Sequence, residues 1–553
     1  MKKIKPWVAI SWFALLSFLT GMIYQSATVS ITRDMISAAE KIIGLEFSDA
    51  KRDSMIDGLQ EQLGNYANLR KVTLANDVMP SVIFNPIPSG FKLETGKSSF
   101  KESKIAPVSM PANIEDLAFY SVGELAYLIK NNKVTSVQLT EMYLSRLKKY
   151  APKLECVISL TEELAIKQAK QADEEIAKGK YRGPLHGIPY GIKDLLSAKG
   201  YKTTWGSVPY KDQVIDEDAT VVKRLTEAGA ILVAKLTMGE LAWGDVWYGG
   251  KTRNPWNTER GSSGSSAGSA SATSAGLVAF SIGTETWGSI VSPSTECGTT
   301  GLRPTYGRVS RHGAMALSWS MDKIGPICRT VEDCALVFNA IYGPDGVDPT
   351  LYNVPFNYDP SVKLNKFRVG YLKNDFDKDS ANKIYYDAVF LKLKELGAAL
   401  IPIELPKYPM NDLAIILTAE SGAAFDELTR SGKDDQLVRQ IKNAWPNVFR
   451  TSRFIPAVEY IQANRVRTLV INDMQKIMND IDVYLAPSFE GDNLLMTNLT
   501  GHPCVVLPIG FNEKSLPVSI CFMGQLFGEG KTLSVAKQFQ DATDFHKKHP
   551  KLD

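Results

Sequence analysis

From about residue 113 onward, hydrophobic residues recur in two alternating patterns. Some stretches place apolar residues every three or four positions, which is typical of an amphipathic helix, and others are short continuous apolar runs, which are typical of buried strands. This alternation favours an α/β domain in which helices cover a sheet. The predicted helices are 121–150 (two capped helices), 161–179 and the first half of 218–236, and the predicted strands are 183–195 and the second half of 218–236.

The first 27 residues have a different pattern. Lys2, Lys3 and Lys5 precede an apolar run from Trp7 to Tyr24. A positive segment followed by about 18 apolar residues is typical of a signal peptide or a membrane anchor. Residues 1–27 are therefore predicted to direct export, with the chain periplasmic or anchored to a membrane rather than cytoplasmic.

Residues 28–112 form a predicted helical extension that ends in a proline-containing loop. Apolar residues at helical spacing between 33 and about 70 indicate two helices, with Ser48 as the N-cap of the second. Pro80, Pro86 and Pro88 then interrupt any regular element. This extension is a candidate for packing or for oligomerisation, with a homodimer as the simplest form, and residues 113–553 form the main domain.

Composition narrows the classes of partner and cofactor. The 63 basic and 60 acidic residues leave a net charge of +3, which predicts no strong attraction to nucleic acid. The six cysteines and five histidines show no metal-ligand spacing, so no metal is expected. We expect the cysteines to be mostly buried free thiols.

The stretch from 258 to 293 holds ten serines among glycines and alanines. It is not a typical linker, because its small residues lead into Leu277–Ile282, a pattern that favours a tightly packed helix and then a strand. A phosphate-binding loop needs a Gly-Lys-Ser/Thr ending, which is missing. Residues 264–268 match G-x-S-x-G, which makes Ser266 the nucleophile of a Ser-His-Asp hydrolase with His502 as a candidate base.

An ordered series of motifs resembles the amidase signature family over residues 114–545, and the detail around the nucleophile is most similar to bacterial peptide amidases. The resemblance implies a single α/β domain around a large mixed sheet, with no metal or organic cofactor. The motifs are GPLHGIPYGIKDL (183–195), GSSAGSA (264–270), IGTETWGSIVSP (282–293), GLRPTYGRVSRHG (301–313), SMDKIGPICRTVEDC (320–334), VRTLVINDM (466–474) and TNLTGHPCVVLPIGF (497–511).

The resemblance also implies catalytic roles. Ser289 is the nucleophile, Lys193 is the base, and Ser265, 24 positions before Ser289, relays the proton and follows a cis peptide bond. Ser266 is then a neighbour within the site. A lysine acts as a base only if burial lowers its pKa, and the apolar, glycine-rich setting of Lys193 predicts this provided that Asp194 points elsewhere.

The backbone N–H groups of the oxyanion loop are implied to come from Thr286, Trp287, Gly288 and Ser289, with Glu285 bracing this loop. Trp287 replaces a residue that is usually small, which predicts a narrower acyl pocket. Val291 replaces an arginine found in many members, which favours a neutral substrate.

These features predict hydrolysis of a carboxamide C–N bond in a small-molecule or peptide amide. The alternative within the family is the A subunit of a glutamyl-tRNA(Gln)/aspartyl-tRNA(Asn) amidotransferase, which releases ammonia from glutamine for a partner. That branch carries an Arg-Tyr-Gly element for which 419–432 has no clear counterpart.

Overall fold

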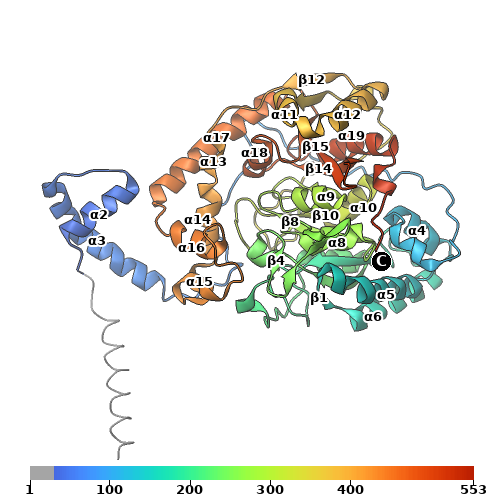
Figure 1. Cartoon of the computed structure of the whole chain (residues 1–553), viewed down its shortest axis with the longest axis horizontal. Coiled ribbons are helices and arrows are strands. Elements are labelled where there is room, and N and C mark those ends of the chain that lie inside the picture. The colour runs from blue at the N-terminus through green and yellow to red at the C-terminus, as the bar shows by residue number, and fades with distance from the viewer. Residues whose placement is uncertain (1–29, 553) are drawn as a thin grey trace, which may run out of the picture. The chain divides into compact units, whose positions relative to one another are not determined.

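The computed structural model describes residues 30–552 and separates the chain into two compact units at Ala75–Asn76 (Figure 1). The predicted signal peptide or anchor, residues 1–27, lies outside the described residues. Within residues 30–552, none of the helices combines the length and the apolar character that crossing a bilayer requires.

The first unit contains two helices, α2 (Arg33–Ile43) and α3 (Asp49–Leu69), which confirms the helical pattern between 33 and 70. An ion pair of 2.7 Å between Arg52 of α3 and Glu40 of α2 joins them. The proline-containing segment that the sequence grouped with these helices belongs to the second unit, which begins at Asn76.

The second unit is built on a mixed sheet that has eleven strands within the described residues. Neighbours are parallel around β2 and around β11 and antiparallel through the middle, so the predicted mixed sheet is present. In sheet order the strands are β1 (Val157–Leu160), β3 (Ile231–Leu236), β2 (Pro189–Lys193), β8 (Phe280–Glu285), β10 (Lys323–Cys328), β9 (Thr300–Arg303), β14 (Cys504–Phe511), β15 (Pro517–Gly524), β13 (Val483–Pro487), β11 (Val369–Leu372) and β12 (Leu400–Ile403). Two hairpins lie apart from it, β4 (Val246–Trp247) with β5 (Gly250–Lys251) and β6 (Arg253–Asn254) with β7 (Asn257–Gly261).

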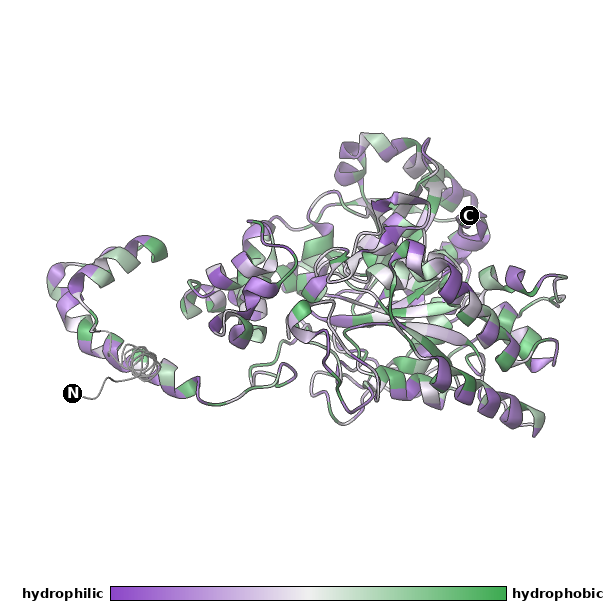
Figure 2. Cartoon of the chain, turned by 60° about the horizontal axis from the view of Figure 1, so that its bottom comes forward, coloured by the Kyte–Doolittle hydropathy of each residue, from purple (hydrophilic) through white to green (hydrophobic). Residues whose placement is uncertain are grey.

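Helices cover the sheet, and hydrophilic residues are frequent on the peripheral helices (Figure 2). Both helices predicted in 121–150 begin with a capping box, in which Ser121 and Glu124, then Thr135 and Gln138, exchange side-chain and backbone hydrogen bonds. The helices are α4 (Val122–Lys130), α5 (Ser136–Leu154), α6 (Glu162–Ala177), α7 (Thr220–Glu227), α8 (Ala267–Ser274), α9 (Val291–Cys297), α10 (Val331–Ile341), α11 (Lys373–Lys378), α12 (Lys383–Glu395), α13 (Met410–Leu413), α14 (Ile415–Ala424), α15 (Asp426–Arg430), α16 (Trp445–Ser452), α17 (Ala457–Met478), α18 (Asn493–Thr500) and α19 (Glu529–Asp541). Short 3₁₀ turns occupy Ile114–Phe119, Val208–Tyr210, Glu240–Ala242, Leu364–Lys366, Ser380–Asn382, Lys433–Gln436 and Phe545–Lys547.

The serine-rich stretch forms α8 followed by β8, as its small residues predict. Every residue of α8 is buried, because the helix approaches other backbone too closely for larger side chains. A Cβ atom on Gly268 would lie 2.5 Å from the carbonyl oxygen of Cys156. The six cysteines are buried and unpaired, which confirms the prediction of free thiols.

Candidate active site

The structure brings Lys193, Ser265 and Ser289 together from three separate segments. Lys193 ends the buried strand β2, Ser265 precedes α8, and Ser289 follows β8. The Lys193 ammonium Nζ lies 2.8 Å from Ser265 Oγ, and Ser265 Oγ lies 3.0 Å from Ser289 Oγ. The two contacts form a continuous line from the lysine to the second serine.

The backbone fixes this line from both sides. The Gly264–Ser265 peptide bond is cis, as the resemblance implied. The N–H of Ser266 donates to the carbonyl oxygen of Ser289 at 3.1 Å, which ties the two serine-bearing segments together. Gly264 has no room for a side chain, because an added Cβ would lie 1.8 Å from the carbonyl oxygen of Gly244.

Lys193 is fully buried and donates a second hydrogen bond to Thr284 Oγ1 at 2.8 Å. Burial disfavours its charged form and lowers the pKa of Lys193 to about 7, although the carboxylates of Asp322 and Glu285 oppose the shift. Asp194 points elsewhere, as expected, because its carboxylate pairs with Lys235 Nζ at 3.0 Å. About half of the Lys193 side chains are therefore neutral near pH 7.

The loop from Thr286 to Ser289 has four consecutive N–H groups that donate no hydrogen bond to any described residue. Buried N–H groups normally have acceptors, so these four are available to an oxygen of a ligand. The turn at Gly288 has φ of +84°, a conformation that favours glycine.

Glu285 braces this loop, as its position in the motif suggested. Its carboxylate accepts the N–H groups of Ile290 and Val291 at 2.9 Å each, and it pairs with Arg303 at 2.7 Å. Burial opposes ionisation, but the charge and hydrogen bonds of Arg303, with the hydrogen bond from Val291, outweigh burial and lower the pKa of Glu285 to about 2. The start of α9 is thereby fixed behind Ser289.

We expect Glu285→Gln to destabilise the fold by about 3 kcal/mol, because it leaves the fully buried Arg303 without its counter-charge. Urea unfolding measures this change. The matched control is Asp387→Asn, which breaks an exposed ion pair with Lys383 and should cost less than about 0.5 kcal/mol. Equal costs for the two variants would contradict the bracing role of Glu285.

Ser266 is occupied by the backbone of β8. Its hydroxyl donates to the carbonyl oxygen of Thr284 at 3.0 Å and accepts the N–H of Thr284 at 3.1 Å. His502 bonds Thr500 instead, and within residues 30–552 no hydrogen bond joins Ser266 to a histidine. The geometry of a Ser-His-Asp hydrolase centred on Ser266 is therefore missing from the described residues.

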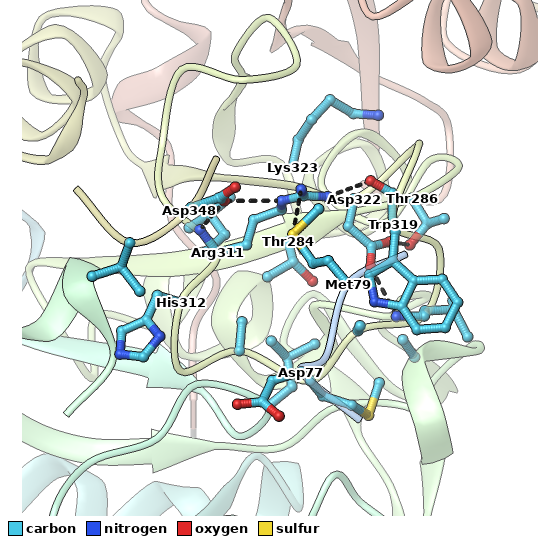
Figure 3. Close-up of a pocket in the computed structure, with 18 of the residues that line it drawn as sticks. Asp77, Met79, Thr284, Thr286, Arg311, His312, Trp319, Asp322, Lys323 and Asp348 are labelled. Carbon is cyan, nitrogen blue, oxygen red and sulfur yellow. Dashed lines mark hydrogen bonds and ion pairs between the residues drawn. The ribbon is translucent and has the colours of Figure 1, made fainter. Parts of the chain in front are cut away.

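A cavity of about 370 Å³ lies beside this group and is lined by Thr284 and Thr286 (Figure 3). Trp287, which the sequence placed at the acyl pocket, is 41% exposed and does not line it. The sequence analysis assigned no role to Thr284 or to Asp322, which accepts a 2.6 Å hydrogen bond from Thr286. Both lie within the motifs given above, so their positions were the available signal.

Comparisons with known proteins place this geometry in context. The family model described as Amidase matches residues 138–494. The Glutamyl-tRNA(Gln) amidotransferase A chain of Coxiella burnetii (strain Dugway 5J108-111) is 34% identical over 480 residues, which cover 78% of this chain and 99% of that protein. The native peptide amidase from Stenotrophomonas maltophilia has a TM-score of 0.69 at 29% identity, covering 77% of this chain and 97% of its own. The corresponding Glutamyl-tRNA(Gln) amidotransferase chain from Thermotoga maritima has a TM-score of 0.65 at 27% identity, covering 77% and 95%.

These relatives correct two expectations. The prediction of an exported, periplasmic or membrane-anchored protein is wrong, because the curated relatives are amidotransferase A chains, which are cytoplasmic. The expectation that nucleic acid plays no part gains no support, since these relatives are named for glutamyl-tRNA. The family itself is established by the match over residues 138–494 and by the identity to full-length relatives. The chain belongs to the amidase signature family.

Proposed function

We propose that this chain cleaves a carboxamide C–N bond through a covalent acyl-enzyme on Ser289. The observation that carries the proposal is the line of contacts from Lys193 Nζ through Ser265 Oγ to Ser289 Oγ, at 2.8 and 3.0 Å. A serine hydroxyl attacks an amide only when a base removes its proton, and a lysine with a pKa of about 7 can do so near neutral pH.

The proton moves along this line. As Ser289 Oγ bonds to the amide carbon, its proton passes to Ser265, whose own proton passes to neutral Lys193. Hydroxyl hydrogens rotate, so the same contacts serve transfer in the reverse direction. Lys193 then returns a proton through Ser265 to the leaving nitrogen, and ammonia or an amine departs. Water attacks the acyl-enzyme by the same route and releases the carboxylate.

The negative charge that forms on the amide oxygen needs hydrogen-bond donors. The N–H groups of Thr286, Trp287, Gly288 and Ser289, which lack acceptors among the described residues, are suited to this role. Losing one such donor typically slows an acyl transfer by about 10²- to 10³-fold. Ser266 acts indirectly by holding Thr284.

We expect the rate to rise with pH through the pKa of Lys193. The working form is neutral lysine, so kcat/KM should increase about tenfold per unit below pH 7 and level off above about pH 8. Initial rates on a neutral amide between pH 5.5 and 9.5 measure this. A rate that continues to rise to pH 10 would indicate a lysine with an ordinary pKa, and a rate that falls with pH would contradict the base.

The cavity favours a neutral substrate with apolar groups. Its ionic side chains already have partners, such as Arg311 with Asp348 at 3.3 Å and His312 with Glu217 at 3.1 Å. A substrate with free charges, such as glutamine, would find few unpaired counter-charges there. We therefore favour a small-molecule or peptide amide without charge next to the scissile bond.

The A subunit of a tRNA amidotransferase is the second candidate, and the curated relatives favour it more strongly than free amide hydrolysis. The Coxiella burnetii protein is 34% identical and is covered over 99% of its length. This role shares the acylation step on Ser289 but requires glutamine as the amide and a partner that uses the ammonia.

Ammonia release by the purified full chain separates the two candidates. The panel contains glutamine, butyramide, hexanamide and a C-terminally amidated apolar dipeptide. We expect kcat/KM for the neutral amides to exceed that for glutamine by at least about tenfold, since each poorly paired charge buried with glutamine lowers binding. A preference for glutamine would overturn the first candidate in favour of the second.

A further inference from the structure

Residues 76–85 cross the edge of the candidate site, and they precede residues 138–494, which the family model matches. Asn76 fixes one end of this segment, which we call the strap. Its side chain donates to the carbonyl oxygen of Ala316 at 3.0 Å and accepts the N–H of Ala316 at 2.7 Å. The strap thus begins with a backbone-like pairing against the cavity wall.

The other end of the strap is fixed by aromatic contacts. The guanidinium of Arg467 lies 3.5 Å from the centre of the Phe84 ring, and the ring of Tyr306 meets Phe84 edge-on at 5.0 Å. Asn85 accepts a 3.0 Å hydrogen bond from the hydroxyl of Tyr352. Since both ends are held, the side chains between them have defined positions.

Met79 lies between these anchors and lines the 370 Å³ cavity beside Thr284 and Thr286, opposite Trp319 (Figure 3). Arg311, which is itself paired with Asp348, contacts the sulfur of Met79 at 3.9 Å. The polar groups of this inner cavity are engaged with one another, so its free surface is mostly apolar. The apolar lining consists of Met79, Leu195, Ala242, Ala314, Met315, Ala316, Leu317, Trp319, Ile324, Val347 and Pro349.

A second cavity of about 750 Å³ lies on the other side of the strap, against α14, α16 and α17. Its lining includes Val82, Ile83 and Phe84 of the strap. Glu420, an acidic residue in this wall, already accepts hydrogen bonds from Ser318, Ser320 and Tyr460. The outer cavity is therefore also mostly apolar.

Met79 and Trp319 line both cavities, so the two spaces meet at this pair. Methionine is unbranched and flexible, which suits a side chain that yields to a ligand. Pockets of 300–1,000 Å³ are typical for organic ligands, and the inner cavity alone is near the lower end of this range.

We propose that the site takes amides with an elongated apolar group, which runs from the inner cavity between Met79 and Trp319 into the outer cavity. The strap, through Met79, then determines how long a group the enzyme accepts. This inference rests on the proposed function for the reacting end of the substrate, and it adds the class of the remainder.

Straight-chain primary amides from acetamide to dodecanamide test the inference on the full chain. We expect kcat/KM to rise with chain length by up to about fourfold for each methylene that becomes buried. Met79→Trp fills the junction and should lower kcat/KM for octanamide and longer amides by at least about tenfold, while acetamide and propionamide change by less than about twofold. Val78→Ser is the matched control, because Val78 lies on the strap and lines neither cavity.

Ile83→Glu is a second variant that does not disturb the junction. Ile83 is 43% exposed and lines only the outer cavity, so the protein should tolerate the carboxylate. We expect it to weaken only the amides long enough to reach the outer cavity. A chain-length profile that is flat in the wild type, or the same in Met79→Trp and Val78→Ser, overturns the inference.

Binding to the Ser289→Ala protein separates this inference from the chemistry. Isothermal titration with the same amides should give a Kd that tightens with chain length and loses this dependence when Met79→Trp is added. That result without turnover in the wild type would uphold the apolar passage and reject the proposed reaction. Turnover without any dependence of rate or Kd on length would do the reverse.

Discussion

Ser289→Ala is expected to lower kcat for amide cleavage by about 10⁴- to 10⁶-fold, the cost typical of removing a catalytic serine that acts as one unit with its base. Without the Oγ atom no acyl-enzyme forms, and the contact from Ser265 to Ser289 at 3.0 Å is lost. Ser289 is largely buried, and this contact is the main one that its hydroxyl makes, so the melting temperature should change little. Ammonia release and the melting temperature of the purified variant measure the two effects.

Ser266→Ala is the matched control for this result. It removes a neighbouring hydroxyl that bonds only the backbone of Thr284. Leaving these buried groups without a partner should cost about 1–3 kcal/mol of stability but retain amide cleavage within about tenfold. Activity that survives in the Ser289 variant and disappears in the Ser266 variant would return Ser266 to the role of nucleophile.

The order of helices and strands in the main domain could be predicted because the signals are local. Apolar spacing and caps identified α4, α5 and α7, and the run of small residues identified α8 next to β8. The mixed sheet itself came from the family resemblance, since the pairing of strands far apart in the chain, such as β9 with β14, leaves no mark in the local pattern.

The candidate site was predictable to a similar extent. The motifs nominated Lys193, Ser265 and Ser289, but they gave no reason to expect Thr284 at 2.8 Å from Lys193 Nζ. They also gave Trp287 a place in the acyl pocket that the cavity lining does not support. The packing of distant segments decides both points.

The amino-terminal part shows where local pattern misleads. Lysines before an apolar run are typical of exported proteins, yet the curated relatives are not exported. Residues 80–88 were recognised only as a proline-containing loop. The contact of Met79 with Trp319, 240 positions away, depends on the tertiary fold and could not be seen in the sequence.

Lys193→Met should lower kcat by about 10²- to 10⁴-fold, the contribution typical of a general base. Methionine nearly matches the length of the lysine side chain and suits the apolar surroundings, so the fold should be retained. The loss should be accompanied by loss of the pH dependence near 7, because that dependence belongs to Lys193. Rates between pH 5.5 and 9.5 for the variant and the wild type measure both effects.

Lys235→Met distinguishes the base from a buried lysine in general. Lys235 is buried next to the same strand, but its ammonium pairs with Asp194 at 3.0 Å. Removing it leaves a buried carboxylate without its counter-charge and should cost about 3–5 kcal/mol of stability. Enzyme that remains folded should nevertheless keep the rise in rate near pH 7, since the line from Lys193 to Ser289 is intact. If instead Lys193→Met keeps this pH dependence and Lys235→Met loses it, the proton leaves Ser289 by another route and the relay through Ser265 is wrong.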